Sequence, residues 1–275
     1  MVWGFVVLCA ALFAAYSIFS MVVRPATDRN WTDDQRILAR TTFRDDGTVF
    51  IEDIRNIEYE SVSVYTPAYY DAAFDPGDIV RAWFIVEPFG KFGAAHTFVS
   101  FEFEDGRFLS VSAEIRKEKG ETFSPIKGLL RRYELVYVIA DERDVLRLRT
   151  NYRKDPVFLY PIKGDVDRVR EVFRDMLHRA NSLAEHPEMY NTLTNNCTTN
   201  IVSHVRKFSD KKIPWWDTPY LFPATVDKVA YEVGLIDTVL SLEKARQHFL
   251  VTSIAQKNDD NPDFSKAIRE SFLTK

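Results

Sequence analysis

The sequence contains very little cysteine, with only Cys9 and Cys197 among 275 residues. Cys9 lies in an apolar run and Cys197 in a polar one, so no disulfide between them is expected and Cys197 is predicted to be a free thiol. Basic charge is not in excess, because 36 Lys and Arg are balanced by 40 Asp and Glu, which argues against a nucleic-acid partner. There is no glycine-rich phosphate loop, and Cys197 and His204 alone are too few ligands for a metal. We therefore expect neither a metal nor another cofactor.

Charged side chains are also missing from residues 1–23. As a helix, residues 2–23 would be about 33 Å long, which matches a hydrocarbon core of about 30 Å. The alternative, a cleaved signal peptide, usually has basic residues before a shorter apolar run, and none precede this one. We predict a transmembrane anchor at 1–23 and a juxtamembrane linker at 24–34. Arg24 and Arg29 weakly favour a cytoplasmic domain.

The remaining sequence has the composition of a globular domain. Hydrophobic residues make up 46% of the chain, which provides ample core material. Alternating and short apolar runs come first and amphipathic runs later, so we predict an α+β fold with a mainly antiparallel sheet followed by helices. The domain is predicted at 35–257, with a polar C-terminal tail at 258–275. The predicted strands are 37–43, 48–54, 59–65, 80–86, 95–103, 107–115, 135–140, 145–149 and 157–160, and the predicted helices are 166–184, 197–208, 225–233 and 241–256.

Cys197 is the strongest candidate for a chemical role. Asn195 or Asn196 is a good N-cap, so Cys197 is predicted in the first turn of a helix. The positive end of the helix dipole favours thiolate over thiol there, and its free N–H groups suit an oxyanion. The alternative is a buried cysteine that packs as a small hydrophobe, and the polar neighbours, Thr198 among them, argue against it.

A thiol nucleophile needs a base, and His96 is the best placed of five histidines. It begins an apolar strand, whereas His204 lies about 10 Å along the predicted helix from Cys197. If residues 104–106 form a three-residue hairpin loop, His96 pairs with Glu114, which then orients the imidazole. A two-residue loop would move Glu114 to the other face and weaken this triad. Further supporting or substrate-binding candidates are Ser112, Tyr190, Asn195, Asn196 and Thr198.

A histidine on a strand followed much later by Asn-Cys at a helix start resembles the circularly permuted papain-like arrangement of the lecithin:retinol acyltransferase family. More closely, the sequence resembles the Lnb N-terminal periplasmic domain family. The matching segments are RPATDRNW (24–31), AHTFVSF (95–101), SAEIRKEKGE (112–121), YELVYVIADERDVLRLRTNYR (133–153), YNTLTNNCTTN (190–200) and DNPDFSKAIR (260–269). The resemblance implies that His96 and Cys197 are the catalytic pair. It also implies a domain that faces the periplasm from the bacterial inner membrane, against the charge signal of Arg24 and Arg29.

Three functions follow as hypotheses. The resemblance implies a thiol acyltransferase that takes an acyl chain from a membrane phospholipid and passes it to an amine, such as the N-terminus of a lipoprotein. The second is a papain-like amidase or peptidase that acts on cell-wall peptides, because the same Cys–His chemistry serves both. The third is a non-catalytic binding domain of the cell envelope. An apolar groove would favour a lipid, and a polar cleft would favour a peptide. The aromatic segment 215–222 is a candidate lipid-contacting surface, although core packing is the alternative.

Overall fold

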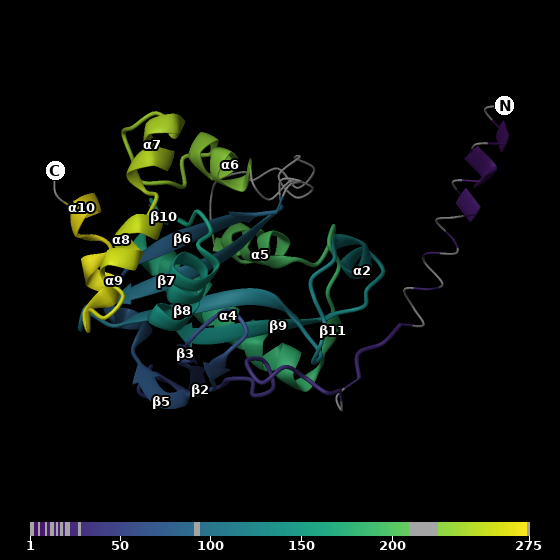
Figure 1. Ribbon diagram of the computed structural model, residues 1–275, viewed down its shortest axis with the longest axis horizontal. Coiled ribbons are helices and arrows are strands. Elements are labelled where there is room, and N and C mark those ends of the chain that lie inside the picture. Colours follow the sequence, from purple (N-terminus) through teal and green to yellow (C-terminus); the bar gives the residue numbers. More distant parts are fainter. Residues whose placement is uncertain are drawn as a thin grey trace.

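A mostly antiparallel sheet of nine strands forms the centre of the domain, with helices on both of its faces (Figure 1). The computed structural model describes residues 23–26, 29–90, 94–208 and 225–273, with scattered positions between 3 and 19. The mixed α+β class predicted from the sequence is therefore correct. Within the described residues, no helix is both long and apolar enough to cross a membrane. Most of the predicted anchor, Cys9 included, and the aromatic segment 215–222 lie outside the described residues, so both remain predictions.

The main path of the sheet runs β1-β2-β9-β8-β7-β6-β10, with β5 added beside β2 and β11 beside β9. All its pairings are antiparallel except that of β2 with β9. The strand bounds are β1 Arg40–Phe43, β2 Val49–Arg55, β5 Tyr69–Phe74, β6 Ile79–Phe89, β7 Ala94–Phe103, β8 Phe108–Arg116, β9 Glu134–Asp141, β10 Phe158–Pro161 and β11 Glu188–Met189.

One face of the sheet is covered by α4 (Val166–Glu185) and α5 (Cys197–Phe208), with α6 (Val226–Glu232) beside them. Alternate residues of β7, such as Val99 and Phe101, point into this layer. We call it the α5 face. The other face carries α3 (Glu142–Arg147), the π-helix η2 (Leu148–Arg153), α8 (Thr252–Lys257) and α9 (Phe264–Ala267). We call this the η2 face. The remaining elements are η1 Pro76–Asp78, β3 Glu58–Tyr59, β4 Tyr65–Thr66, α2 Pro125–Leu129, α7 Leu242–His248 and α10 Glu270–Leu273.

Several sequence predictions were wrong in detail. The predicted strand 59–65 is two short strands, β3 and β4, which pair with each other. The predicted strand 145–149 is helical, because the Asp141 carboxylate caps α3 by accepting a hydrogen bond from the Arg143 N–H. The segment predicted as a polar tail at 258–275 packs against the domain over its described part, since Phe264 and Ile268 are buried in the core. Strand β5 and helix α2 were not predicted.

Candidate active site

Cys197 begins α5, as predicted, and Asn196 is its cap. The Asn196 side-chain oxygen accepts a hydrogen bond from the Thr199 N–H (2.9 Å), and the Asn196 N–H donates to the Thr199 hydroxyl oxygen (2.8 Å). These reciprocal hydrogen bonds satisfy donors that the first turn leaves without partners. Cys197 is a free thiol and is 7% exposed. The cap therefore fixes the first turn of α5 with the sulfur in a buried position.

The hairpin that carries His96 has a three-residue loop at 104–106, the first of the two loop lengths that the sequence left open. Gly106 has a φ of 84°, and the Phe103 N–H donates to the Arg107 carbonyl (3.0 Å). This loop sets the register of β7 against β8, which pair from Glu102↔Phe108 to Val99↔Val111. The ladder then stops, although β7 continues to pair with β6 and β8 with β9. The two strands therefore separate beyond Val99 and Val111, and we call this gap the β7–β8 opening.

The N-terminus of α5 lies against the β7–β8 opening. Alternate hydrogen-bonded pairs of this hairpin would next join Thr97 to Ala113. Instead, the Thr97 N–H and hydroxyl group face Cys197 and help to lower the pKa of its thiol, and the Thr97 hydroxyl oxygen lies 3.3 Å from that of Thr198. The backbone donor freed by the end of the ladder is thus directed at the sulfur.

His96 lies on the opposite side of β7 from this contact. Its ring stacks on Phe98, in the core of the η2 face, and its side chain is 14% exposed. His96 and Cys197 nevertheless interact, because the strands between them are parted. A histidine on one face and a cysteine on the other thus meet through the β7–β8 opening.

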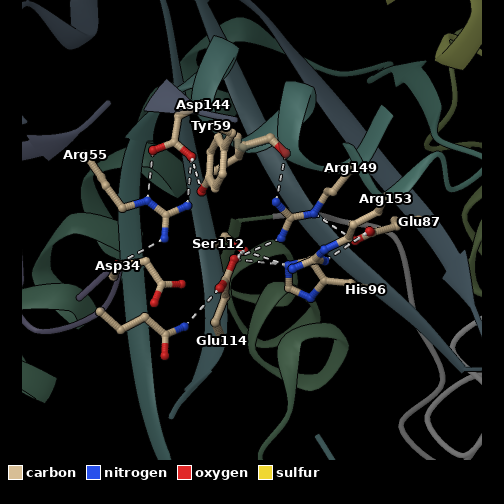
Figure 2. Close-up of polar contacts among 12 residues, drawn as sticks. Asp34, Arg55, Tyr59, Glu87, His96, Ser112, Glu114, Asp144, Arg149 and Arg153 are labelled. Atoms are coloured by element: carbon tan, nitrogen blue, oxygen red, sulfur yellow. Dashed lines mark hydrogen bonds and ion pairs between the residues drawn. The ribbon is translucent and has the colours of Figure 1, made fainter. Parts of the chain in front are cut away.

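Ser112 connects His96 to Glu114 (Figure 2). The Ser112 hydroxyl donates to Glu114 Oε1 (2.9 Å), so its oxygen accepts from His96 Nε2 (2.7 Å). Glu114 Oε1 itself lies 3.6 Å from His96 Nε2. Glu114 therefore reaches the imidazole mainly through Ser112, and not by the direct contact that the sequence suggested. Because Nε2 carries the proton toward Ser112, Nδ1 is the nitrogen that remains for Cys197.

Glu114 is held by two further side chains that the sequence did not identify. Arg149 Nη2 donates to Glu114 Oε1 (3.0 Å), and Gln35 Nε2 donates to Oε2 (3.3 Å). Arg149 also binds Glu87, the residue paired with His96 across β6 and β7 (Figure 2). For Glu87, the sequence offered one signal of a role at the site: a carboxylate directly after the apolar run 80–86. Arg149 lies in the predicted strand 145–149, and its role depends on the helical fold of that segment.

The charges of the site favour a thiolate–imidazolium pair. Burial alone would raise the pKa of Cys197, but hydrogen bonding and the charge of His96 outweigh it and lower this pKa to about 7. Burial alone would lower the pKa of His96, but its interactions with the Cys197 thiolate and the Glu114 carboxylate raise it to about 9. The pKa of buried Glu114 lies well below its usual range because of His96 and Arg149. Between pH 7 and 9 the pair is therefore an ion pair.

The other predicted site residues have mainly structural contacts. Asn195 bonds to the Met189 carbonyl (3.2 Å), and its side-chain oxygen accepts from Asn200 (2.9 Å), so it fixes the loop before α5. Tyr190 is buried, and burial together with the charge of Cys197 raises the pKa of its phenol. The phenol of Tyr190 therefore stays uncharged near Cys197.

A thiol at a capped helix start and a histidine with a linked carboxylate define a candidate cysteine-nucleophile site. The family comparison agrees with the resemblance seen in the sequence: residues 65–230 match the model of the Lnb N-terminal periplasmic domain. This match spans more than half of the chain, and the protein belongs to that family, whose description makes this a periplasmic domain. No curated protein and no solved structure matches the chain.

Proposed function

We propose that this protein is a thiol acyltransferase that forms an acyl-thioester on Cys197. The observation that carries the proposal is the coupling of a helix-capped thiol to His96, which lowers the pKa of Cys197 to about 7. A thiolate at neutral pH is a nucleophile, and the imidazolium beside it is a proton donor. We include in this proposal the circularly permuted papain-like arrangement, the anchor at 1–23 and a location in the bacterial inner membrane.

In the first half-reaction, the Cys197 thiolate attacks the ester carbonyl of a phospholipid. The carbonyl oxygen becomes an oxyanion, for which the backbone N–H groups at the start of α5 and that of Thr97 are the candidate donors. The C–O bond then breaks, and His96 gives its Nδ1 proton to the departing lysophospholipid oxygen. An acyl-thioester remains on Cys197.

In the second half-reaction, the amine of an acceptor attacks the thioester carbonyl. His96 takes the proton of the amine, the C–S bond breaks, and Cys197 leaves as a thiolate. Ser112 and Glu114 hold the Nε2–H tautomer throughout, so that Nδ1 alternates between base and acid. An acceptor such as the N-terminus of a lipoprotein fits this chemistry.

An apolar cavity supports an acyl chain over a peptide as the transferred group. It has a volume of about 260 Å³ and lies between β6, β7, α4, α5 and α6. Ile201 of α5 contributes to its lining, one helical turn beyond Cys197, and Val99 lines it from the sheet. Its other side chains are mostly aliphatic or aromatic, and its charged lining residues are Lys163 and Asp165, between β10 and α4, and Arg168 of α4. Hydrocarbon is the ligand class that such a lining favours.

The test is to incubate detergent-solubilised full-length protein with phospholipid and measure its intact mass. We expect an added acyl mass that hydroxylamine removes and that is missing in Cys197→Ala. Thr199→Ala, which loosens the cap without removing the thiol, should keep the adduct at a lower rate. If no adduct forms while muropeptides are cleaved in a Cys197-dependent way, the protein is an amidase and the acyltransferase proposal is wrong.

A further inference from the structure

An exposed apolar surface surrounds the short helix α2. Ile126 is 70% exposed, although α2 lies in a folded part of the domain. Four other large apolar side chains near it are more than one third exposed, and a contiguous group of this kind commonly marks an interaction site. These residues are Phe123, Leu129, Leu130 and Leu193. We call the five side chains the α2 surface.

Hydrogen bonds join the two segments that form the α2 surface. The Thr192 hydroxyl donates to the Pro125 carbonyl (2.8 Å), and Asn191 Nδ2 donates to the Leu129 carbonyl (3.2 Å). Leu193 is therefore held beside α2. The same loop leads into α5, and Cys197 follows Leu193 by four residues. The α2 surface is thus part of the surroundings of the candidate nucleophile.

Two observations indicate what covers this surface. The Tyr16 hydroxyl, from the uncharged run 1–23, donates to the Leu129 carbonyl (3.0 Å) and accepts from Asn191 Nδ2 (2.8 Å). In Figure 1, α2 lies on the side of the domain from which the N-terminal segment extends. Lys127 and Arg132, both exposed, flank the apolar side chains. An apolar centre with cations at its margin is complementary to a bilayer that contains anionic lipids.

We propose that the α2 surface inserts into the interfacial layer of the membrane and holds the Cys197 site at the bilayer. The apolar side chains enter the acyl boundary, while Lys127 and Arg132 contact lipid phosphates. This proposal goes beyond the acyl transfer proposed above and does not depend on it, because a surface binds lipid whether or not a thioester forms.

The experiment measures which surface positions contact lipid in the full-length chain. Single cysteines are introduced by Ile126→Cys or Leu193→Cys in a Cys9→Ser, Cys197→Ser background and labelled with an environment-sensitive fluorophore. Val239→Cys is the matched control, since Val239 is an exposed aliphatic residue between α6 and α7, away from α2 (Figure 1). The protein is reconstituted in vesicles of phosphatidylethanolamine and phosphatidylglycerol, with and without spin-labelled acyl chains.

We expect blue-shifted emission and quenching by the spin-labelled chains at positions 126 and 193, and neither at position 239. Lys127→Gln with Arg132→Gln should weaken this quenching in vesicles with phosphatidylglycerol more than in vesicles in which neutral phosphatidylcholine replaces the phosphatidylglycerol. If the probes at 126 and 193 remain as water-exposed as the one at 239, the proposal is overturned and the α2 surface serves a protein partner. That result would leave the mass test of Cys197 acylation untouched, so the two proposals fail separately.

Discussion

Two histidines of this protein each lie near a carboxylate and a hydroxyl group, yet their electrostatics differ. His96 contacts Ser112 and, through it, Glu114, and its pKa is raised to about 9. His204 of α5 lies with Nδ1 2.6 Å from Asp175 Oδ2 and with Nε2 2.7 Å from the hydroxyl oxygen of Tyr137, which also donates to Asn200 Oδ1 (3.2 Å). Its pKa is lowered, chiefly by burial.

The partner at the second ring nitrogen accounts for the difference. At His96 that partner is a thiol, which ionises near neutral pH and then stabilises the imidazolium. At His204 it is a phenol whose pKa is raised by burial, so it stays neutral. Lys207 also binds Asp175 and opposes a positive charge on His204. In this fold, the pKa of a histidine beside a carboxylate is therefore raised where the other ring nitrogen faces a group that can ionise, and lowered where it faces a neutral phenol.

The largest expected effect separates the two histidines. His96→Gln should slow formation of the acyl adduct by about 10²–10⁴-fold, the usual contribution of general acid–base catalysis. His204→Gln should leave that rate nearly unchanged but lower the free energy of unfolding by about 1–3 kcal/mol, because buried polar groups lose partners. Intact-mass kinetics and thermal denaturation measure the two effects. If His204→Gln folds but forms no adduct, His204 is also needed for the reaction, and the proposed difference between the two histidines is wrong.

The pH dependence of the thiol sharpens the same comparison. Because His96 lowers the pKa of Cys197 to about 7, the rate of alkylation by iodoacetamide should rise as the pH increases through about 7. In His96→Gln, burial acts with less opposition and the midpoint should move to higher pH. The measurement uses a Cys9→Ser background, with His204→Gln as the control. Equal midpoints in the two histidine variants would show that His96 does not act on the sulfur.

Ser112→Ala should act on the upper limb of the pH profile. Ser112 accepts from Nε2–H in both protonation states, but a hydrogen bond to the charged imidazolium is stronger by about 1 kcal/mol, so its loss should lower the pKa of His96 by about one pH unit or less. The raised His96 pKa keeps the imidazolium present below about pH 9, so the variant should lose activity at a lower pH than wild type. The rate of adduct formation between pH 6 and 10 would show this shift.

Ser110→Ala is the matched control for this measurement. Ser110 is buried two residues earlier on the same face of β8, and among the described residues its hydroxyl has no hydrogen-bond partner. Its removal should leave the profile unchanged, and Ser112→Thr should restore it. If both alanine variants shift the profile equally, the effect is one of packing and not of the Ser112 link.

The smallest effect concerns the apolar cavity on the α5 face. Val205→Trp should partly fill it and favour short acyl chains over long ones, at a cost in stability of about 1–3 kcal/mol from overpacking. Ser203→Trp places the same ring on the exposed side of α5 and should leave the chain-length preference unchanged. Competition between phospholipids of different chain length, read by intact mass, gives the ratio. An unchanged ratio in Val205→Trp would contradict the proposal that this cavity binds the acyl chain.

Local signals predicted the local parts of the site. The cap signal at Asn195 and Asn196 located the start of α5, and the Glu-Asp-Gly turn located the hairpin and reduced the register of β7 on β8 to two alternatives, one of which is observed. Both features depend on side-chain preferences within a few residues, which a sequence displays directly.

The parts that depend on distant residues could not be predicted. The β7–β8 opening leaves no mark in the alternation of β7, because β6 still pairs with Thr97 and its neighbours. Arg149 binds Glu114 only because α3 continues into η2, whereas the apolar residues around it suggested a strand. The buried Arg269 likewise pairs with Glu142, far away in the sequence, so that a segment with a polar composition belongs to the core.

The β7–β8 opening implies a competition between two arrangements of the same strands. If the β7–β8 ladder continued, Thr97 would pair with Ala113, and each added backbone hydrogen bond would stabilise the hairpin by about 0.5–1.5 kcal/mol. The N-terminus of α5 lies where this pairing would form, and Cys197 takes the place of Ala113 as the group that the Thr97 N–H faces. We expect that displacement of the α5 N-terminus would let β7 and β8 pair between His96 and Cys197. The proposed acyl transfer therefore depends on the position of one helix end.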